Sequence, residues 1–511
     1  MRNAILCILY TACGGAQQFQ LQSPAPVPRY GIAEFSLHIT SPRFPNPFTE
    51  PAPTAEITTP TGAKHIFTGF SDSNDGSLFR LRFSPSQPGA HRFLVRMGAF
   101  RQKGEFTAEA SPNQGPVDVD PDHPKHFRYA TGAPFFHLGY TAYHLLDPSK
   151  TDAEVEALLD YCGRNGFNKI RFLLSGYPRD TETRTSTDNE HGVPDPKRAP
   201  NYGAPKGRVN PLPAWPGQPH AYDFTRFHLP FWRRAEAIIA SMQRRAIQAN
   251  IILTIEKQNL PDEFGRLTDH ELRFYRYAFS RLGAYSNVWW DLGNEHNEYR
   301  DKAWGDAMGA VLRALDPHQR LASVHAYADF WYTQSNWASY IVTQQYGTET
   351  EVYNWVRKYE NTPKPYVNEE YGYEGPANTP GHLQNADWTR RTHWAIAMAG
   401  GYATYGDWSG NVAWYYSGDP GRGIAATQLK HLRSLFETLP YNTMKPCPES
   451  VPNGFCLAAP NGKRVYYMPN GATPQTPPGH TLRRYDPRLG QFPIATPTAA
   501  NNTDWVYLTE P

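Results

Sequence analysis

The middle of the chain, from about residue 125 to 430, alternates short apolar runs with amphipathic helical stretches. Helical patterns cover 152–166, 230–246 and 301–315. Strands that alternate with helices indicate a parallel sheet with helical crossovers, which is the α/β class. Eight strands in about 300 residues fit a (β/α)8 TIM barrel. The predicted strands are 135–140, 168–174, 249–256, 287–294, 321–326, 340–346, 365–371 and 401–408.

β-rich patterns flank the predicted barrel on both sides. Short alternating runs with Pro and Gly between them predict an N-terminal β-sandwich within residues 17–115. A Pro-rich linker, 111–124, leads into a barrel domain of 125–430. Short strands return after it, so we expect 431–511 to form a small C-terminal β-domain. A length of 511 residues agrees with several domains.

The first residues read as a secretory signal peptide. Arg2 gives a positive start, 4–13 is apolar, and Gly14-Gly15-Ala16 is a small-residue cleavage site, so residues 1–16 would be removed. The apolar run is too short to cross a bilayer, and no other segment predicts a membrane span. The stretch 10-YTAC-13 also resembles a bacterial lipobox, in which Cys13 would carry a lipid anchor. We therefore expect a secreted or periplasmic protein, with a cell-surface lipoprotein as the alternative.

The cysteines and the charge balance indicate which disulfide, metal site and partner the chain could have. In an exported protein, Cys447 and Cys456 are the natural disulfide pair. Cys162 falls on a helical pattern, which indicates a buried free thiol. No Cys/His cluster has zinc-ligand spacing, and no phosphate-binding or nucleotide fingerprint occurs, so we predict no metal and no cofactor. The 50 basic and 48 acidic residues form no Lys/Arg block, which argues against a nucleic-acid partner.

Two of the predicted barrel strands end in carboxylates. Asn294-Glu295 follows the apolar run 288–292, and Glu369-Glu370 ends the run 365–371. Catalytic side chains of TIM barrels come from the carboxyl ends of the strands. Two carboxylates facing each other there suit glycoside hydrolysis, at about 5–5.5 Å in retaining enzymes and further apart in inverting ones. A cation such as Arg171, on the second strand, would keep one of them ionised.

Each motif contains a rival carboxylate. Glu298 lies one step further into the loop than Glu295 and is more typical of an ordinary loop residue. Strand alternation predicts that Glu369 and Glu370 point to opposite sides, so that only one faces the barrel mouth. Since a Glu after an apolar strand is common in loops, the prediction depends on the pair of motifs rather than on either one.

These motifs resemble those of the clan A glycoside hydrolases, whose fourth strand ends in Asn-Glu and whose seventh ends in Glu-aromatic-Gly. The matching residues are Asn294-Glu295 and Glu370-Tyr371-Gly372. More narrowly, 132-GAPFFHLGYTAYHLL-146, 167-FNKIRF-172, 288-VWWDLGNEHNE-298 and 365-PYVNEEYGYEG-375 are similar to the DUF4038-type barrels, the apiosidase-like group. The front region is similar to the DUF5060 β-sandwich that commonly precedes such barrels, and the tail to their C-terminal β-domain.

The resemblance implies a role for each main site residue. Glu295 would be the acid/base and Glu370 the nucleophile of a double displacement. Asn294 would hydrogen-bond the sugar hydroxyl beside the reacting carbon, and Arg171 would orient the nucleophile. Tyr346, ending the sixth strand, would hydrogen-bond the nucleophile, and Trp408, ending the eighth, would stack under the reacting sugar.

Three further residues, His137, Tyr140 and His325, lie at predicted strand ends and are candidates for lining the sugar site. The long connection 177–223 follows the second strand and is expected to form a substrate wall. The resulting hypothesis is a secreted retaining glycoside hydrolase acting on plant or algal polysaccharide-derived glycans. The alternative is a non-catalytic carbohydrate-binding protein on a barrel scaffold. The partner in either case is an oligo- or polysaccharide.

Overall fold

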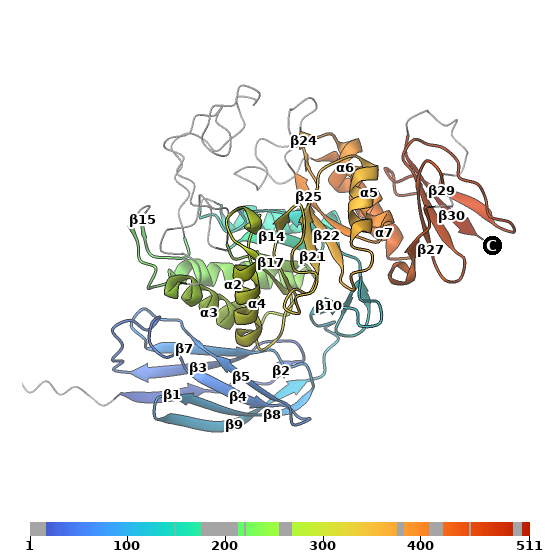
Figure 1. Ribbon diagram of the computed structural model, residues 1–511. Helices are drawn as coiled ribbons and strands as arrows, with labels where there is room; N and C mark the ends of the chain where they lie inside the picture. The colour runs from blue at the N-terminus through green and yellow to red at the C-terminus, as the bar shows by residue number, and fades with distance from the viewer. Residues whose placement is uncertain are drawn as a thin grey trace, which may run out of the picture. The chain divides into compact units, whose positions relative to one another are not determined.

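The computed structural model describes residues 17–148, 150–174, 213–218, 221–254, 268–375, 383–407, 423–448, 451–493 and 503–510 (Figure 1). The predicted signal peptide with Cys13, the candidate Trp408 and most of the connection 177–223 lie outside these residues. The chain forms two compact units, Met1–Ala110 and Ser111–Pro511.

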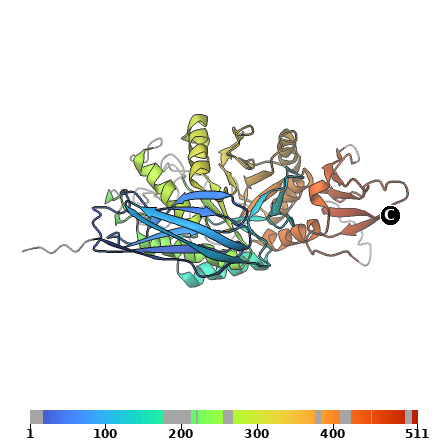
Figure 2. The ribbon, with the colours of Figure 1, turned by 90° about the horizontal axis from the view of Figure 1, so that it is seen from below.

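The first unit is a sandwich of two sheets, drawn in blue in Figures 1 and 2. One sheet has the order β1 (Gln18–Gln22), β3 (Ala33–Thr40), β7 (Leu78–Phe83) and β6 (Phe70–Ser71). The other has the order β2 (Val27–Pro28), β9 (Phe100–Glu109), β8 (Gly89–Met97), β4 (Thr54–Thr58) and β5 (Lys64–Thr68). Alternate residues of β3 are buried, and Phe35 meets Phe93 of β8 edge-on at 4.9 Å between ring centroids. This alternation is the pattern that predicted a β-sandwich.

The second unit is built on a curled sheet of parallel strands with helices outside it (Figure 1). Its strands are β13 (Gly139–Thr141), β14 (Lys169–Leu173), β17 (Gln248–Ile252), β18 (Val288–Asp291), β19 (Ala322–Ser323), β20 (Ala326–Tyr327), β21 (Ile341–Gln344), β22 (Tyr366–Glu370) and β25 (Tyr402–Asp407). The first and last strands, β13 and β25, pair in parallel. β19 pairs with β18, and β20 with β21, so two short pieces of the predicted fifth strand complete the (β/α)8 arrangement.

The helices alternate with these strands as predicted. They are α1 (Asp152–Arg164), α2 (Leu229–Arg244), α3 (Asp269–Leu282), α4 (Lys302–Leu315), α5 (Glu349–Lys358), α6 (Ala386–Met398) and α7 (Ile424–Phe436), with the short 3-10 turns η3 (His296–Glu298) and η4 (Tyr441–Thr443). α1 and α5 each begin with a capping box, which fixes where the helix starts. α7 runs across residue 430, the predicted end of the barrel domain. Among the described residues, no helix is long and apolar enough to span a membrane.

Short strands accompany the barrel. They are β10 (Val117–Val119), β11 (Phe127–Tyr129) and β12 (Pro134–Phe135) in one sheet, the hairpin of β15 (Gly217–Gln218) and β16 (Ala221–Tyr222), and β23 (Tyr373–Glu374) with β24 (Leu383–Gln384).

The C-terminal residues form an antiparallel sheet that packs on α6. Its order is β26 (Lys445–Pro446), β27 (Phe455–Ala458), β28 (Arg464–Met468), β30 (Trp505–Glu510) and β29 (Thr481–Tyr485). Arg390 of α6 forms a buried ion pair with Asp504 at 2.6 Å, and the Trp394 and Tyr467 rings stack at 5.4 Å. The disulfide between Cys447 and Cys456 is present, as predicted. Cys162, in α1, is buried and free, which was also predicted.

Candidate active site

Arg171, in β14, is the centre of a buried hydrogen-bond network near the carboxyl ends of the strands. Its side chain is fully buried, and Nε lies 3.1 Å from Oδ2 of Asp291, in β18. Nη1 donates to the Tyr143 hydroxyl at 2.7 Å, and Nη2 donates to Asn294 Oδ1 at 2.7 Å. Since a guanidinium stays protonated in proteins, the network places a fixed positive charge under the barrel mouth.

His325 joins this network from the fifth strand. Its Nδ1 lies 2.8 Å from Arg171 Nη2 and 2.8 Å from Asn294 Oδ1. Burial, with repulsion from Arg171, keeps the pKa of His325 well below its ordinary value, so the ring is neutral near pH 7. Its backbone N–H donates to the Gly293 carbonyl at 3.0 Å and lies 3.1 Å from Asp291 Oδ1, between β19 and β20. His325 therefore positions Arg171 and Asn294 without adding charge.

Glu370, the last residue of β22, is held on both carboxylate oxygens. Oε1 accepts a hydrogen bond from the Tyr346 hydroxyl at 2.5 Å, as the resemblance implied, and Oε2 accepts one from Tyr143 at 3.1 Å. Burial raises the pKa of Glu370, while the Tyr346 hydrogen bond and the charge of Arg171 act against that rise. A carboxylate with this support has the fixed direction that a nucleophile needs.

Glu295 is close enough to the same two tyrosines for its charge to act on them. The pKa values of Tyr143 and Tyr346 are raised well above the ordinary value, first by burial and then by the charges of Glu370 and Glu295. Glu295 is partly exposed, and its backbone is left-handed, with φ 47°. A non-glycine residue keeps this conformation only where its surroundings hold it, and such positions cluster at active sites. The two glutamates thus share one pair of tyrosine neighbours but differ in exposure.

A family model described as the catalytic domain of apiosidase-like proteins matches residues 122–443, well over half of the chain. The chain belongs to the apiosidase-like family. A second model, the domain of unknown function DUF5060, matches residues 26–98, within the N-terminal sandwich. No curated protein matches the chain.

Solved structures with the same fold support this membership. A Bacteroides vulgatus protein assigned as a glycoside hydrolase is 20% identical, with a TM-score of 0.76 over 95% of this chain and 100% of that chain. A family 5 glycoside hydrolase from Bacteroides vulgatus is 17% identical, with a TM-score of 0.57 over 78% of this chain and 93% of that chain. These likenesses show the fold, and family and fold together make this apiosidase-like protein a glycosidase.

In this apiosidase-like barrel, Glu369 lies in a different setting from Glu370. Its carboxylate is buried, forms an ion pair with Lys169 of β14 and accepts a hydrogen bond from Thr404. Lys169 Nζ also lies 5.4 Å from the Trp289 ring centroid. The charge of Glu369 is therefore balanced by Lys169 inside the barrel.

The predicted alternation of these two glutamates is wrong for a structural reason. The pairing of β21 with β22 contains a register shift, in which Thr343 lies opposite Asn368 and Gln344 lies opposite Glu370. Glu369 is the extra residue, as in a β-bulge, so the simple two-residue period breaks at this point. Both carboxylates therefore contact side chains from the inner face of the barrel.

Two predicted sugar-site residues lie away from this network. His137 precedes β13 at the amino end of the strand and packs on the rings of Phe127 and Trp289, at 6.5 and 6.2 Å. Tyr140 is fully buried and packs on Phe167 at 5.2 Å, with Tyr161 of α1 at 6.2 Å. Both side chains are core residues, and the prediction that they line the sugar site is wrong.

Glu298, at the end of η3, is exposed, in keeping with a loop residue.

Tyr143 and Asp291 belong to the site, although the motifs did not single them out. Tyr143 contacts Arg171, Asn294 and Glu370, and Asp291 pairs with Arg171. One signal for Asp291 was available, since a carboxylate inside an apolar strand requires a buried cation. Tyr143 follows its strand by two residues and reads as an ordinary core aromatic.

Glu374, in β23, anchors the start of α7. Its carboxylate accepts hydrogen bonds from Tyr405 at 2.7 Å and from the backbone N–H groups of Ile424 and Ala425 at 2.7 and 3.0 Å. Burial raises the pKa of Glu374 to about 7. Glu374 therefore accepts from the first N–H groups of α7, which is a structural role.

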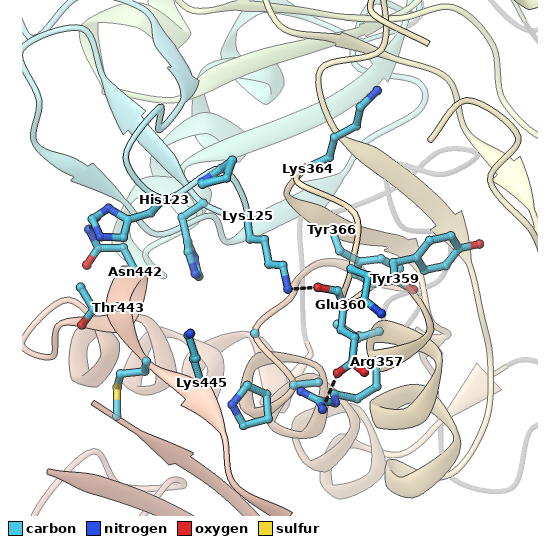
Figure 3. A pocket seen from close by; sticks show the side chains of 18 of the residues that line it. His123, Lys125, Arg357, Tyr359, Glu360, Lys364, Tyr366, Asn442, Thr443 and Lys445 are labelled. Carbon is cyan, nitrogen blue, oxygen red and sulfur yellow. Dashed lines mark hydrogen bonds and ion pairs between the residues drawn. The ribbon is translucent and has the colours of Figure 1, made fainter. Parts of the chain in front are cut away.

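A cavity of about 730 Å³ lies near the amino ends of β22 and β25, between α5 and the start of the C-terminal sheet (Figure 3). Lys125 donates to the backbone carbonyl of Glu360, whose carboxylate pairs with Arg357. None of the predicted site residues lines this cavity. It lies at the opposite end of the strands from Glu370, at the face that TIM barrels use for stability.

Among the described residues, no group of three or more His, Cys, Asp or Glu could hold a metal ion.

Proposed function

We propose that the chain is a retaining glycosidase in which Glu370 is the nucleophile and Glu295 is the general acid and base. The observation that carries the proposal is the asymmetry of two carboxylates around one tyrosine pair. Glu370 is 9% exposed and hydrogen-bonded on both oxygens, with Arg171 close by. Glu295 is more exposed, as a group that exchanges protons with a leaving group and then with water must be.

The reaction would follow two displacements. A Glu370 oxygen attacks the anomeric carbon while Glu295 gives its proton to the leaving oxygen, so the glycosidic bond breaks and a glycosyl ester forms. Glu295, now ionised, takes a proton from water, which attacks the same carbon and releases Glu370. Tyr346 and Tyr143 hold the carboxylate in place in the resting enzyme.

Asn294 is suited to bind the reacting sugar. Its Oδ1 accepts a hydrogen bond from Arg171 at 2.7 Å and lies 2.8 Å from His325 Nδ1, which fixes the direction of the amide. The amide Nδ2 is left to donate to a sugar hydroxyl, and the hydroxyl beside the reacting carbon is the nearest to Glu295 and Glu370. Such a bond contributes to rate when it strengthens in the transition state.

The proposal includes export and a plant or algal glycan as substrate. The N-terminal pattern supports a secreted or periplasmic enzyme, with a lipid anchor at Cys13 as the alternative. The disulfide Cys447–Cys456 also supports an oxidising compartment. The long connection 177–223 favours a walled site and release of side-chain sugars.

The test is hydrolysis of a panel of plant and algal oligosaccharides by the wild type and by the variants Glu295→Gln, Glu370→Gln and Glu298→Gln. We expect sugar release by the wild type and by Glu298→Gln, and loss of release in the other two variants. Proton NMR of the first product should show the anomeric configuration of the substrate. Unchanged hydrolysis by Glu370→Gln, or an inverted first product, would contradict the proposal.

A further inference from the structure

Two aromatic side chains are exposed near the carboxyl end of the fifth strand. Only two aromatic residues are exposed among those that the structure describes. Tyr327 is 49% exposed and Trp331 is 36% exposed. Tyr327 is the last residue of β20, and Trp331 lies four residues further along the chain. Because most other tryptophans and tyrosines in the described part of the chain are buried, two exposed ones this close in sequence suggest a contact surface.

The backbone under Tyr327 is fixed to the loop that carries Glu295. Asn297 Nδ2 donates to the Tyr327 carbonyl at 2.6 Å, and the Tyr327 N–H donates to Asn297 Oδ1 at 2.8 Å. The next residue, Ala328, is left-handed, with φ 66°. The two hydrogen bonds and the left-handed residue fix the path of the backbone from which the Tyr327 side chain projects.

Trp331 is held outward by its neighbours in the chain. Phe330 and Tyr332, on either side, are buried, and the Phe330 N–H donates to the Tyr359 hydroxyl at 3.0 Å. The Trp331 ring meets the edge of His296 at 5.3 Å between centroids. Because both flanking side chains are anchored inward, the indole cannot turn into the core without displacing one of them.

His296 links Trp331 to the active site. It follows Glu295 directly, and its Nδ1 donates to the His325 carbonyl at 2.9 Å, so Nε2 accepts from the Tyr332 hydroxyl at 3.1 Å. Burial lowers the pKa of His296 to about 4, so this neutral form persists across the working range of most enzymes. The loops after β18 and β20 are thereby joined, with Glu295 on one and the two exposed aromatics on the other.

We propose that Tyr327 and Trp331 form a subsite for the sugar on the leaving side of the cleaved bond. The inference rests on the proposed function, because that function makes Glu295 the residue that protonates the leaving oxygen. The apolar C–H face of a sugar ring packs well on an aromatic face, and an exposed, fixed ring binds at low entropic cost. The substrate is then an oligosaccharide with a sugar ring on its leaving side.

The test compares two substrates with the same reacting sugar. One is the panel oligosaccharide that the wild type cleaves fastest, and the other is the glycosyl fluoride of its released sugar, which has no leaving ring. Tyr327→Ala and Trp331→Ala should each lower kcat/KM for the oligosaccharide about tenfold. Both variants should keep the rate of the fluoride within about twofold, because only the leaving ring contacts the subsite.

Matched controls separate stacking from a folding defect. Tyr327→Phe and Trp331→Phe keep a ring and should retain most of the oligosaccharide rate. Phe492→Ala removes a partly exposed ring that packs on Tyr485 of the C-terminal sheet, and it should leave both rates unchanged. Equal losses on both substrates, or no loss on the oligosaccharide, would overturn the subsite.

A third variant separates this inference from the proposed function. Fluoride leaves without a proton, so Glu295→Gln should still give a burst of fluoride while losing the oligosaccharide. If that burst is absent, the role of Glu295 is wrong. If it is present and the alanine variants do not discriminate between substrates, the subsite alone is wrong.

Discussion

Replacing Tyr346 with Phe should move the acid limb of the pH–rate profile to higher pH. The Tyr346 hydroxyl donates to Glu370 Oε1 at 2.5 Å and so stabilises the carboxylate over the carboxylic acid. A hydrogen bond to a charged group contributes about 1.5–3 kcal/mol. One pKa unit corresponds to about 1.4 kcal/mol, so the pKa of Glu370 should rise by about 1–2 units.

The assay is kcat/KM for the fastest panel substrate as a function of pH, since this ratio reports the groups of the free enzyme. Glu370 must be ionised to attack, so the ascending limb follows its pKa and should rise with it. Tyr366→Phe is the matched control, because it removes a buried hydroxyl that contacts Thr343 at 2.6 Å rather than Glu370. This control should leave the limb in place.

Two results would refute the reasoning. An ascending limb that stays at its wild-type pH in Tyr346→Phe would mean that Glu370 is not the group whose ionisation limits the reaction. A shift of equal size in Tyr366→Phe would mean that the barrel, and not the hydrogen bond, sets the profile.

Other perturbations separate structural carboxylates from the reacting one. Glu369→Gln should be destabilised by about 3–5 kcal/mol in thermal unfolding, because Lys169 becomes an unpaired buried charge. Glu370→Gln should instead stay close to wild-type stability while losing hydrolysis. Burial raises the pKa of Glu374 from its ordinary 4.5 to about 7, so the folded state binds a proton that the unfolded state releases. Wild-type stability should therefore fall by about 3 kcal/mol as pH rises through this window, and Glu374→Gln should flatten that slope in denaturant titrations. Asp504→Asn should lower the unfolding temperature, since Arg390 would lose its buried partner between α6 and the C-terminal sheet.

The strand and helix order of the barrel could be predicted because each element carries its own local signal. Apolar runs of strand length alternate with helical periods, and most predicted strands are present with shifted ends. The fifth strand is an exception. Residues 321–326 read as one strand, but β19 ends at Ser323 and β20 begins at Ala326, with the His325 N–H shared between the Gly293 carbonyl and the Asp291 carboxylate. That contact joins residues distant in sequence, so no local period encodes it.

The site residues could be predicted where a sequence motif marks the end of a strand. They could not be predicted where strand register decides which way a side chain faces. Asn294, Arg171, His325, Tyr346 and Glu370 all meet in one network. Tyr140 was misassigned because a strand residue near a motif faces in or out by register alone, and in β13 it faces the helices.

The register shift at Glu369 has the same origin. The choice of Glu370 came from family resemblance, while the bulge in β22 depends on how β21 pairs with it. Strand pairing is a tertiary property, which explains why alternation gave the wrong side for one of the two glutamates.

The most direct measurement of the central claim is mass spectrometry of the glycosylated enzyme. Glu295→Gln, mixed with the glycosyl fluoride of the released sugar, should complete the first displacement and stall before the second. After an acid quench and proteolysis, the account predicts one sugar residue attached to the peptide containing Glu370, and fragmentation should place it on that side chain. A sugar attached to Glu369 or to another residue, or no covalent adduct together with an inverted product, would contradict it.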